Sequence, residues 1–164
     1  VAAGRADFKQ ACSKFEEITK TKPENQRMVL LLASLANAAF CRLFGGDAAA
    51  MLIVFIATLA GYRLKQIMLS EKLDTRLTFF CSAFFSSVIC TGSHIFGWGN
   101  TPEIAVGTSV LYLIPGIPYI NSVSDMLDGH YICMFGRLTD AIVLTASLSA
   151  GLCAGMLLMN LSLC

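Results

Sequence analysis

The sequence carries little charge for its length. Only 14% of its 164 residues are Asp, Glu, Lys or Arg, whereas 55% are hydrophobic, and the mean hydropathy is +0.66. An average soluble domain contains about 25% charged residues, so this composition excludes water as the only solvent of the folded chain. The formal net charge of +1 provides no broad basic field, so we expect no nucleic acid partner.

Features of secreted, metal-binding and nucleotide-driven proteins are also lacking. The first 27 residues are polar, so no apolar run marks a cleavable signal. The seven cysteines are widely spaced without a CxxC pair, which argues against a disulfide framework or a zinc site and favours cysteines as small packing residues. No nucleotide-binding loop is present, and we expect no cofactor. Because the chain begins at Val1 rather than Met, we expect further sequence upstream.

Five apolar stretches are long enough to cross a membrane. A hydrocarbon core of about 30 Å requires about 20 mostly apolar residues in a helix. The expected spans cover residues 28–44, 48–62 with an extension through 65, 77–95, 103–114 and 138–163. A short amphipathic piece at 121–135 and an N-terminal cytosolic or interfacial helix ending at Pro23 complete the pattern. We predict an all-α integral membrane protein with a lead-in at 1–27 and a five-helix transmembrane domain at 28–164.

The distribution of Lys and Arg predicts the orientation of these spans. Six precede the first span, one borders the turn after it, four follow the second, none lies between the third and fourth, and one lies between the fourth and fifth. Cytoplasmic loops are enriched in these residues. The alternation therefore predicts a cytoplasmic N-terminus and an external C-terminus, which agrees with an odd number of spans.

Polar and small residues recur on one side of three expected spans. The positions are Ser34, Asn37 and Cys41; Ser82, Ser86, Cys90 and Ser93; and Asp140, Ser147, Gly151 and Ala154. Such residues face other helices or a water-filled path, because exposure to acyl chains is costly. Close packing explains the serines and a GxxxG at 151–155. For Asn37, an interhelical hydrogen bond and a solute contact both stay open.

The sharpest feature is the sequence Pro115-Gly116-Ile117-Pro118 in the fourth expected span. Each proline removes a backbone donor and interrupts the helix. Carbonyls from Thr108 onward then lose partners, which is tolerated at membrane depth only against protein or a water-filled cavity. A helix from 103 to 115 advances about 18 Å, so we expect the break on the cytoplasmic side of the midplane. It is either a simple kink or a solute site of the kind that broken helices form in transporters.

Polar residues follow the break directly. Asn121 is expected to cap the next helix, and it shares one face with Asp125 and Asp128 at i, i+4 and i+7. One interpretation is a solvated, capped turn favoured by the helix dipole. The other is a cytoplasmic vestibule in which Asp125 or Asp128 binds a cation, exchanges a proton or pairs with Arg137. Arg137 could equally pair with Asp140.

Two motifs resemble the bacterial threonine/serine exporter family, in particular its five-span, half-length members that act with a smaller partner protein. The first is the run NAAFCRLF at 37–44 followed by Gly46 and Asp47. The second and more specific is the run GTSVLYLIPGIP at 107–118 with later polar residues. These later residues are Asn121, Asp125, Gly129 and Arg137, followed by Leu138.

The resemblance implies a subunit of a bacterial inner-membrane exporter, driven by an ion or solute gradient, that moves threonine and serine or a dicarboxylate such as succinate. It implies a smaller membrane protein as the second half, and homo-oligomers are compatible with it. We expect no enzyme, although a weak alternative is an intramembrane hydrolase that uses Ser93 or the aspartates. The stronger alternative is a non-transporting scaffold subunit. The substrate-path candidates are Asn37, Thr108, Pro115, Gly116, Pro118, Asn121, Asp125, Asp128 and Arg137.

Overall fold

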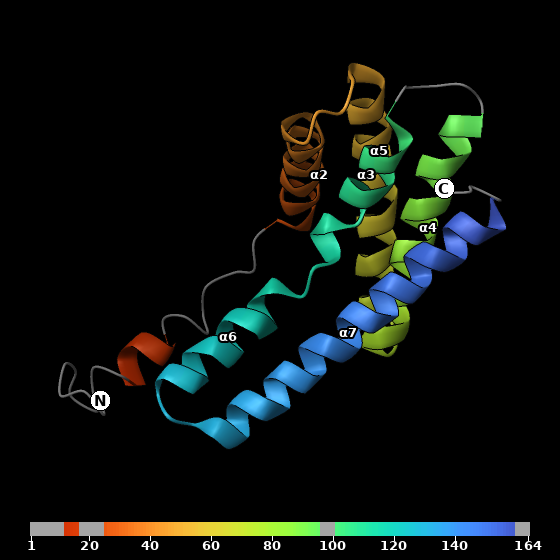
Figure 1. Cartoon of the computed structure of the whole chain (residues 1–164). Coiled ribbons are helices and arrows are strands. Elements are labelled where there is room, and N and C mark those ends of the chain that lie inside the picture. The colour runs from red at the N-terminus through yellow and green to blue at the C-terminus, as the bar shows by residue number, and fades with distance from the viewer. Residues whose placement is uncertain (1–11, 17–24, 96–100, 160–164) are drawn as a thin grey trace.

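The computed structural model describes residues 12–16, 25–95 and 101–159, and this part of the chain contains helices and turns without a strand. Residues 12–16 are helical, and the rest of the predicted N-terminal helix lies outside the described residues. Figure 1 shows the course of the chain. The elements that follow are α2 (Gln26–Leu43), α3 (Ala48–Ser70), α4 (Thr75–Ile95), α5 (Pro102–Ser109), the 3-10 turn η1 (Leu111–Leu113), α6 (Gly116–Leu127) and α7 (Tyr131–Leu158).

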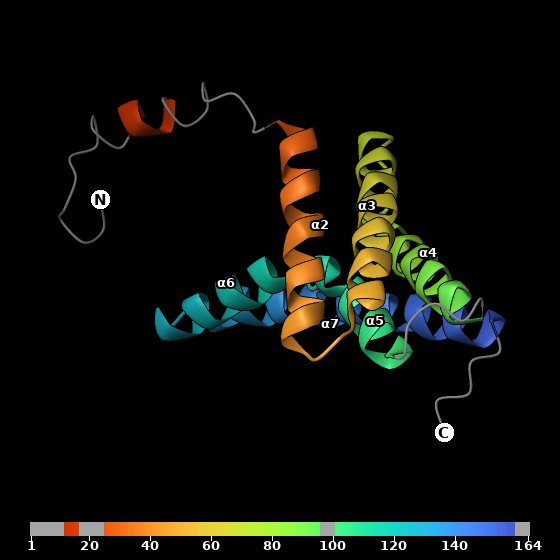
Figure 2. The same cartoon turned by 90° about the horizontal axis from the view of Figure 1, so that it is seen from above.

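The helices form a bundle with a hairpin attached to it. Helix α3 packs against α2, α4 and α5, while α7 packs along α4 and against α6. Figure 2 shows that α6 and α7 lie across the direction of α2 and α3. The turn between α2 and α3 is tight, because Gly45 adopts φ +89° and Asp47 caps α3 by accepting a hydrogen bond from the Ala50 N–H at 2.9 Å.

The interior is rich in hydroxyl groups and the surface is apolar, the reverse of a soluble protein. Ser34, Thr58 and Ser86 are fully buried, whereas Leu35 and Leu52 are more than 60% exposed. Many interior hydroxyls donate to a carbonyl one turn earlier in the same helix, as Ser34 does to Leu30 at 2.9 Å. This arrangement suits a chain surrounded by lipid, where polar groups turn inward.

The all-helical prediction is confirmed for the described residues, whereas the number of spans is not. Helices α3 and α7 are long and apolar enough to cross a membrane, and the bent pair 102–113 and 116–127 adds a third candidate if it counts as one span. Helices α2 and α4 lie where spans were predicted but do not meet the same test. Their polar residues are the reason: α2 has Arg27 and Arg42 near its ends, and α4 carries a row of serines and threonines.

The interruption of the fourth predicted span begins earlier than expected. Helix α5 ends at Ser109, and the chain turns through η1 before the bent pair resumes at 60° to its first part. Pro115 explains the position, because it has no N–H for the Leu111 carbonyl and its ring clashes with that carbonyl in an α-helix. The Leu111 carbonyl instead accepts from the Ile114 N–H at 3.2 Å, so a 3-10 turn replaces the α-helix.

Two boundaries after the break differ from the prediction. Asn121 does not cap a helix, since α6 begins at Gly116 and Asn121 lies in its middle. Pro118 is tolerated in the first turn of α6, where backbone N–H groups have no intrahelical acceptor anyway. The amphipathic piece expected at 121–135 is divided by a turn in which Gly129 adopts φ +78°, and α7 begins at Tyr131 rather than near 138.

The interior face of α7 also differs from the predicted stripe. Asp140 is exposed, Ser147 and Ala154 are half-buried, and Gly151 is the one predicted member that is fully buried. The observed face consists of Ala141, Leu148, Gly151 and Gly155, with Leu144 partly buried beside Leu148. The glycines let α7 approach α4 closely: a Cβ at Gly151 would meet the Phe80 carbonyl, and one at Gly155 would lie 2.7 Å from the Ser87 Cβ.

We therefore expect Gly155→Val to lower the thermal unfolding midpoint of the purified protein in detergent, because overpacking of a close contact costs about 1–3 kcal/mol. Gly136→Val is the matched control, since it changes the same residue type in the same helix where nothing lies within 4 Å. Equal midpoints for the two variants would contradict the close α4–α7 contact.

Candidate functional site

A cavity of about 630 Å³ lies where the start of α4 faces the first half of α6 and the middle of α7. Its lining is more polar than that of the cavities at Phe44, at Ala60 and at Gly129. We call it the charged pocket. Its lining consists of Asp74, Thr75, Arg76, Ile117, Pro118, Asn121, Arg137, Asp140 and Leu144. These residues belong to three segments that are far apart in the sequence, and the bend at Pro115 brings the α6 residues against α4 and α7.

Two of the four charges in this pocket already have partners. Asp74 caps α4, since its Oδ1 accepts a hydrogen bond from the Arg76 N–H at 2.8 Å. Arg137 Nη1 lies 2.7 Å from Asp125 Oδ2, which joins α7 to α6. This ion pair is one of the alternatives predicted for Asp125, and the structure places it where the Arg137 guanidinium also borders the pocket.

Four other polar side chains in the lining have no such partner. They make no hydrogen bond or ion pair with the described part of the chain and belong to Thr75, Arg76, Asn121 and Asp140. As far as the described residues go, the pocket therefore presents one unpaired guanidinium, one unpaired carboxylate, one amide and one hydroxyl. A guanidinium offers a planar pair of donors that matches a carboxylate, and a carboxylate accepts from an ammonium group.

Three predicted residues lie outside the lining of the pocket. Pro115 is buried and precedes the first residue of α6, Gly116, so both belong to the bend itself. Asp128 is exposed at the C-terminal end of α6, one turn beyond Asp125, where it has no place in the pocket lining.

Two further predicted residues lie in other parts of the bundle. Asn37 is buried and donates to the Thr58 hydroxyl at 3.1 Å, so the structure shows the interhelical hydrogen bond between α2 and α3 that was one of its two interpretations. Thr108 is buried and lines a second, mainly apolar cavity of about 350 Å³. The side chain of Ser93 lies outside the described residues.

The sequence pattern did not indicate Arg76 as a site residue. Arg76 was used only as one of the four cations after the second span that predict the orientation. Asp140 was predicted as a possible partner of Arg137 and as a member of the stripe on α7. A usable signal was present at the start of α4, where Asp74 and Thr75 mark a helix N-terminus. Nothing in the sequence placed that helix start against α6 and α7.

Comparison with known proteins agrees with the family resemblance of the motifs at 37–47 and 107–118. Residues 1–159 match the family described as "Putative threonine/serine exporter". The chain is 31% identical over 147 residues to a protein of Escherichia coli K12 named "Probable succinate transporter subunit YjjP", covering 88% of this chain and 57% of that protein. A protein of the same name from Klebsiella aerogenes is 28% identical over 156 residues, covering 94% and 60% of the two chains.

The chain thus spans less than two thirds of the length of these relatives. No solved structure matches it.

The Asp125–Arg137 ion pair can be tested with a double-mutant cycle. We expect Asp125→Asn and Arg137→Gln to show a coupling of under about 1 kcal/mol in the free energy of unfolding in detergent, because Arg137 is half exposed and its charge is screened. Asp128→Asn combined with Arg137→Gln is the control and should show no coupling. A control coupling as large as that of Asp125 would refute the assignment.

Proposed function

Because the chain belongs to the threonine/serine exporter family, whose members are named as transporters and not as enzymes, we propose that it is a subunit of a bacterial inner-membrane exporter. The solute is a small polar molecule that enters through the charged pocket. One observation carries this proposal: the unpaired guanidinium of Arg76, the unpaired carboxylate of Asp140 and the amide of Asn121 line one cavity beside an interrupted helix.

The position of the pocket suits uptake from the cytoplasm. It lies at the start of α4, where the connection from α3 carries Lys72 and the first turn of α4 carries Arg76. The start of α2 belongs to the same end, since Gln66 Nε2 in α3 donates to the Gln26 carbonyl at 3.2 Å. Cations concentrate on the cytoplasmic side of membrane proteins. Under the proposed five-span topology, this end, the lead-in at 1–27 and the pocket face the cytoplasm, and the C-terminus lies outside.

The charges in the pocket restrict the chemistry of the solute. Arg76 can hold a carboxylate in a two-pronged hydrogen bond, and Asn121 can donate to or accept from a second polar group. A zwitterionic amino acid such as threonine or serine would place its ammonium group against Asp140. A dicarboxylate such as succinate would instead meet a second cation only if Arg137 exchanged Asp125 for the solute.

Export further requires a driving force and a partner. We propose that an ion or solute gradient drives it, and that a smaller membrane protein supplies the second half of the transporter, in keeping with the word "subunit" in the names of the relatives. Homo-oligomers of this chain are compatible with the arrangement. The exposed apolar side chains of α6 and α7, among them Ile120 and Ile132, then contact lipid or the partner.

We expect Arg76→Gln to reduce export at least tenfold, because a carboxylate loses its bidentate partner, worth more than about 1.4 kcal/mol. The measurement is efflux of labelled threonine and of labelled succinate from cells or vesicles containing the full chain and a small candidate partner. Arg63→Gln is the control, since Arg63 is an exposed cation on α3 outside the charged pocket. Full export by Arg76→Gln would remove the pocket from the mechanism, and absence of flux under every pairing would favour the scaffold role.

The choice between solutes can be read from Asp140. If an amino acid is exported, Asp140→Asn should raise its KM because the ammonium group loses its counter-charge. If a dicarboxylate is exported, the same change should leave KM unchanged or lower it by removing a like charge. The same efflux assay measures both, and an equal effect on the two solutes would show that Asp140 does not recognise solute charge.

A further inference from the structure

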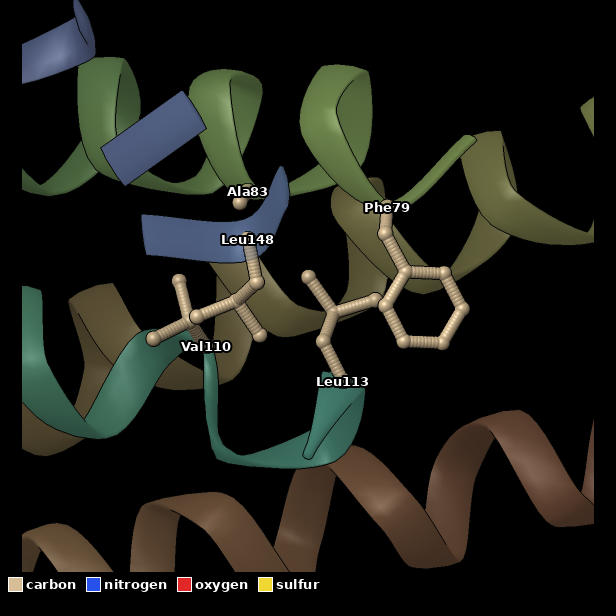
Figure 3. Close-up of a cluster of buried hydrophobic side chains, with 5 residues drawn as sticks. All are labelled: Phe79, Ala83, Val110, Leu113 and Leu148. Carbon is tan, nitrogen blue, oxygen red and sulfur yellow. The ribbon is translucent and has the colours of Figure 1, made fainter. Parts of the chain in front are cut away.

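The inner wall of the charged pocket is continuous with an apolar cluster. Leu144 lines the pocket and packs against this cluster, which we call the apolar plug. Figure 3 shows its five buried members, which converge from α4, from α7 and from the turn at the bend. They are Phe79, Ala83, Val110, Leu113 and Leu148. The plug therefore lies between the pocket and the interior of the bundle.

The region beside the plug is polar. Ser82 and Ser86 follow Phe79 along α4 and are fully buried. The Tyr112 hydroxyl lies 3.1 Å from Ser86 Oγ and 3.5 Å from the Ser82 carbonyl. Among the described residues the Ser82 hydroxyl has no hydrogen-bond partner, although it is fully buried. An unsatisfied buried hydroxyl costs free energy unless another state or a guest provides its partner.

Leu113 belongs to the element of the plug with the fewest backbone constraints. It is only 1% exposed, yet it ends a three-residue 3-10 turn. The turn closes through two hydrogen bonds, from the Leu113 N–H to the Val110 carbonyl and from the Ile114 N–H to the Leu111 carbonyl. Pro115 follows and contributes no donor. Such short 3-10 segments often mark hinges, so the turn can move while α5 and α6 stay intact.

A specific contact holds this turn against the bundle. The Tyr112 hydroxyl occupies a notch at Gly61, where a Cβ would collide with both the hydroxyl and Ser86 Oγ. The Tyr112 ring also lies 5.7 Å from the Tyr62 ring. Because Tyr112 and Leu113 are neighbours on η1, the contact of the Tyr112 hydroxyl with the notch also holds Leu113 in the plug.

We propose that the apolar plug is the gate of the solute path, that Leu113 is its moving part, and that Tyr112 is the latch that keeps it closed. The inference rests on the proposed function, since it assigns a barrier to the path that begins in the charged pocket. When the turn moves outward, the Ser82 and Ser86 hydroxyls become available to the solute. When it returns, five apolar side chains exclude hydrated solutes, as hydrophobic constrictions do in channels.

The barrier can be tested by thiol labelling without measuring transport. Ser82→Cys places a reporter of nearly equal size behind the plug, and peptide mass spectrometry distinguishes position 82 from the native cysteines. We expect a charged, membrane-impermeant thiol reagent to label this position slowly in the parent and at least tenfold faster with Leu113→Ala. Ile114→Ala is the matched control, because Ile114 is the next residue and is 52% exposed outside the plug.

Equal labelling rates with Leu113→Ala and Ile114→Ala would overturn the gate, as would rapid labelling of the Ser82→Cys parent. If Leu113→Ala fails to fold, Tyr112→Phe decides, since it keeps the ring and removes only the hydroxyl that bonds Ser86. We expect Tyr112→Phe and Gly61→Ala each to speed labelling at position 82, and unchanged rates in both would overturn the latch.

The labelling experiment and the export assay test the gate and the proposed function independently. If Leu113→Ala exposes a protected position 82 but the protein moves no solute with any partner, the barrier is supported and the proposed function is refuted. If export depends on Arg76 but Leu113→Ala leaves the labelling rate at position 82 unchanged, the proposed function is supported and the gate is refuted.

Discussion

The loss of helical hydrogen bonding between Val110 and Pro115 is the constraint on which the rest of this structure depends. An α-helix through this region would leave the Leu111 carbonyl against a proline ring without a donor. The chain instead forms a 3-10 turn and resumes as α6 at an angle of 60°. That bend carries Pro118 and Asn121 to the start of α4, so the charged pocket exists because a span-length helix does not continue.

Packing of α7 on α4 completes the pocket from its other side. Gly151 and Gly155 allow the two helices to approach until glycine backbone meets the carbonyls and small side chains of α4. In an apolar surrounding, where hydrophobic burial contributes little to helix association, close van der Waals contact of this kind stabilises a helix pair. The contact fixes the direction of α7, and hence the position of Asp140 and Arg137, which lie about three to five turns earlier in the helix.

Local patterns predicted much of the fold and only part of the candidate site. Apolar stretches located α2, α3 and α4, since hydrophobic periodicity is a local property of the sequence. The break at PGIP was predicted. Asn121 was wrongly expected to cap the following helix, because Pro118 was placed before that helix rather than in its first turn. The buried face of α7 was also wrong, because its polar residues were assumed to point inward.

The site itself depends on tertiary contacts that no local pattern contains. Asp125 and Arg137 are separated by a turn, and their pairing was one of several alternatives until α6 and α7 were seen as a hairpin. Arg76 is 61 residues before Arg137 in the sequence, yet both border one cavity. Charge counts assign such residues to a side of the membrane, but only the bend at Pro115 brings them to the same cavity.

The two cavities beside the interrupted helix are linked by the same short turn. The charged pocket contains Ile117 and Pro118, which follow the turn, and the second cavity contains Thr108 and Leu111, which precede it or belong to it. Phe44 places the second cavity at the end of α2, whereas the charged pocket lies at the start of α4. Leu111 in η1 lines the second cavity directly, and the chain runs from η1 through Ile114 and Pro115 into the first turn of α6, which lines the charged pocket, so the walls of the two cavities share one short chain segment.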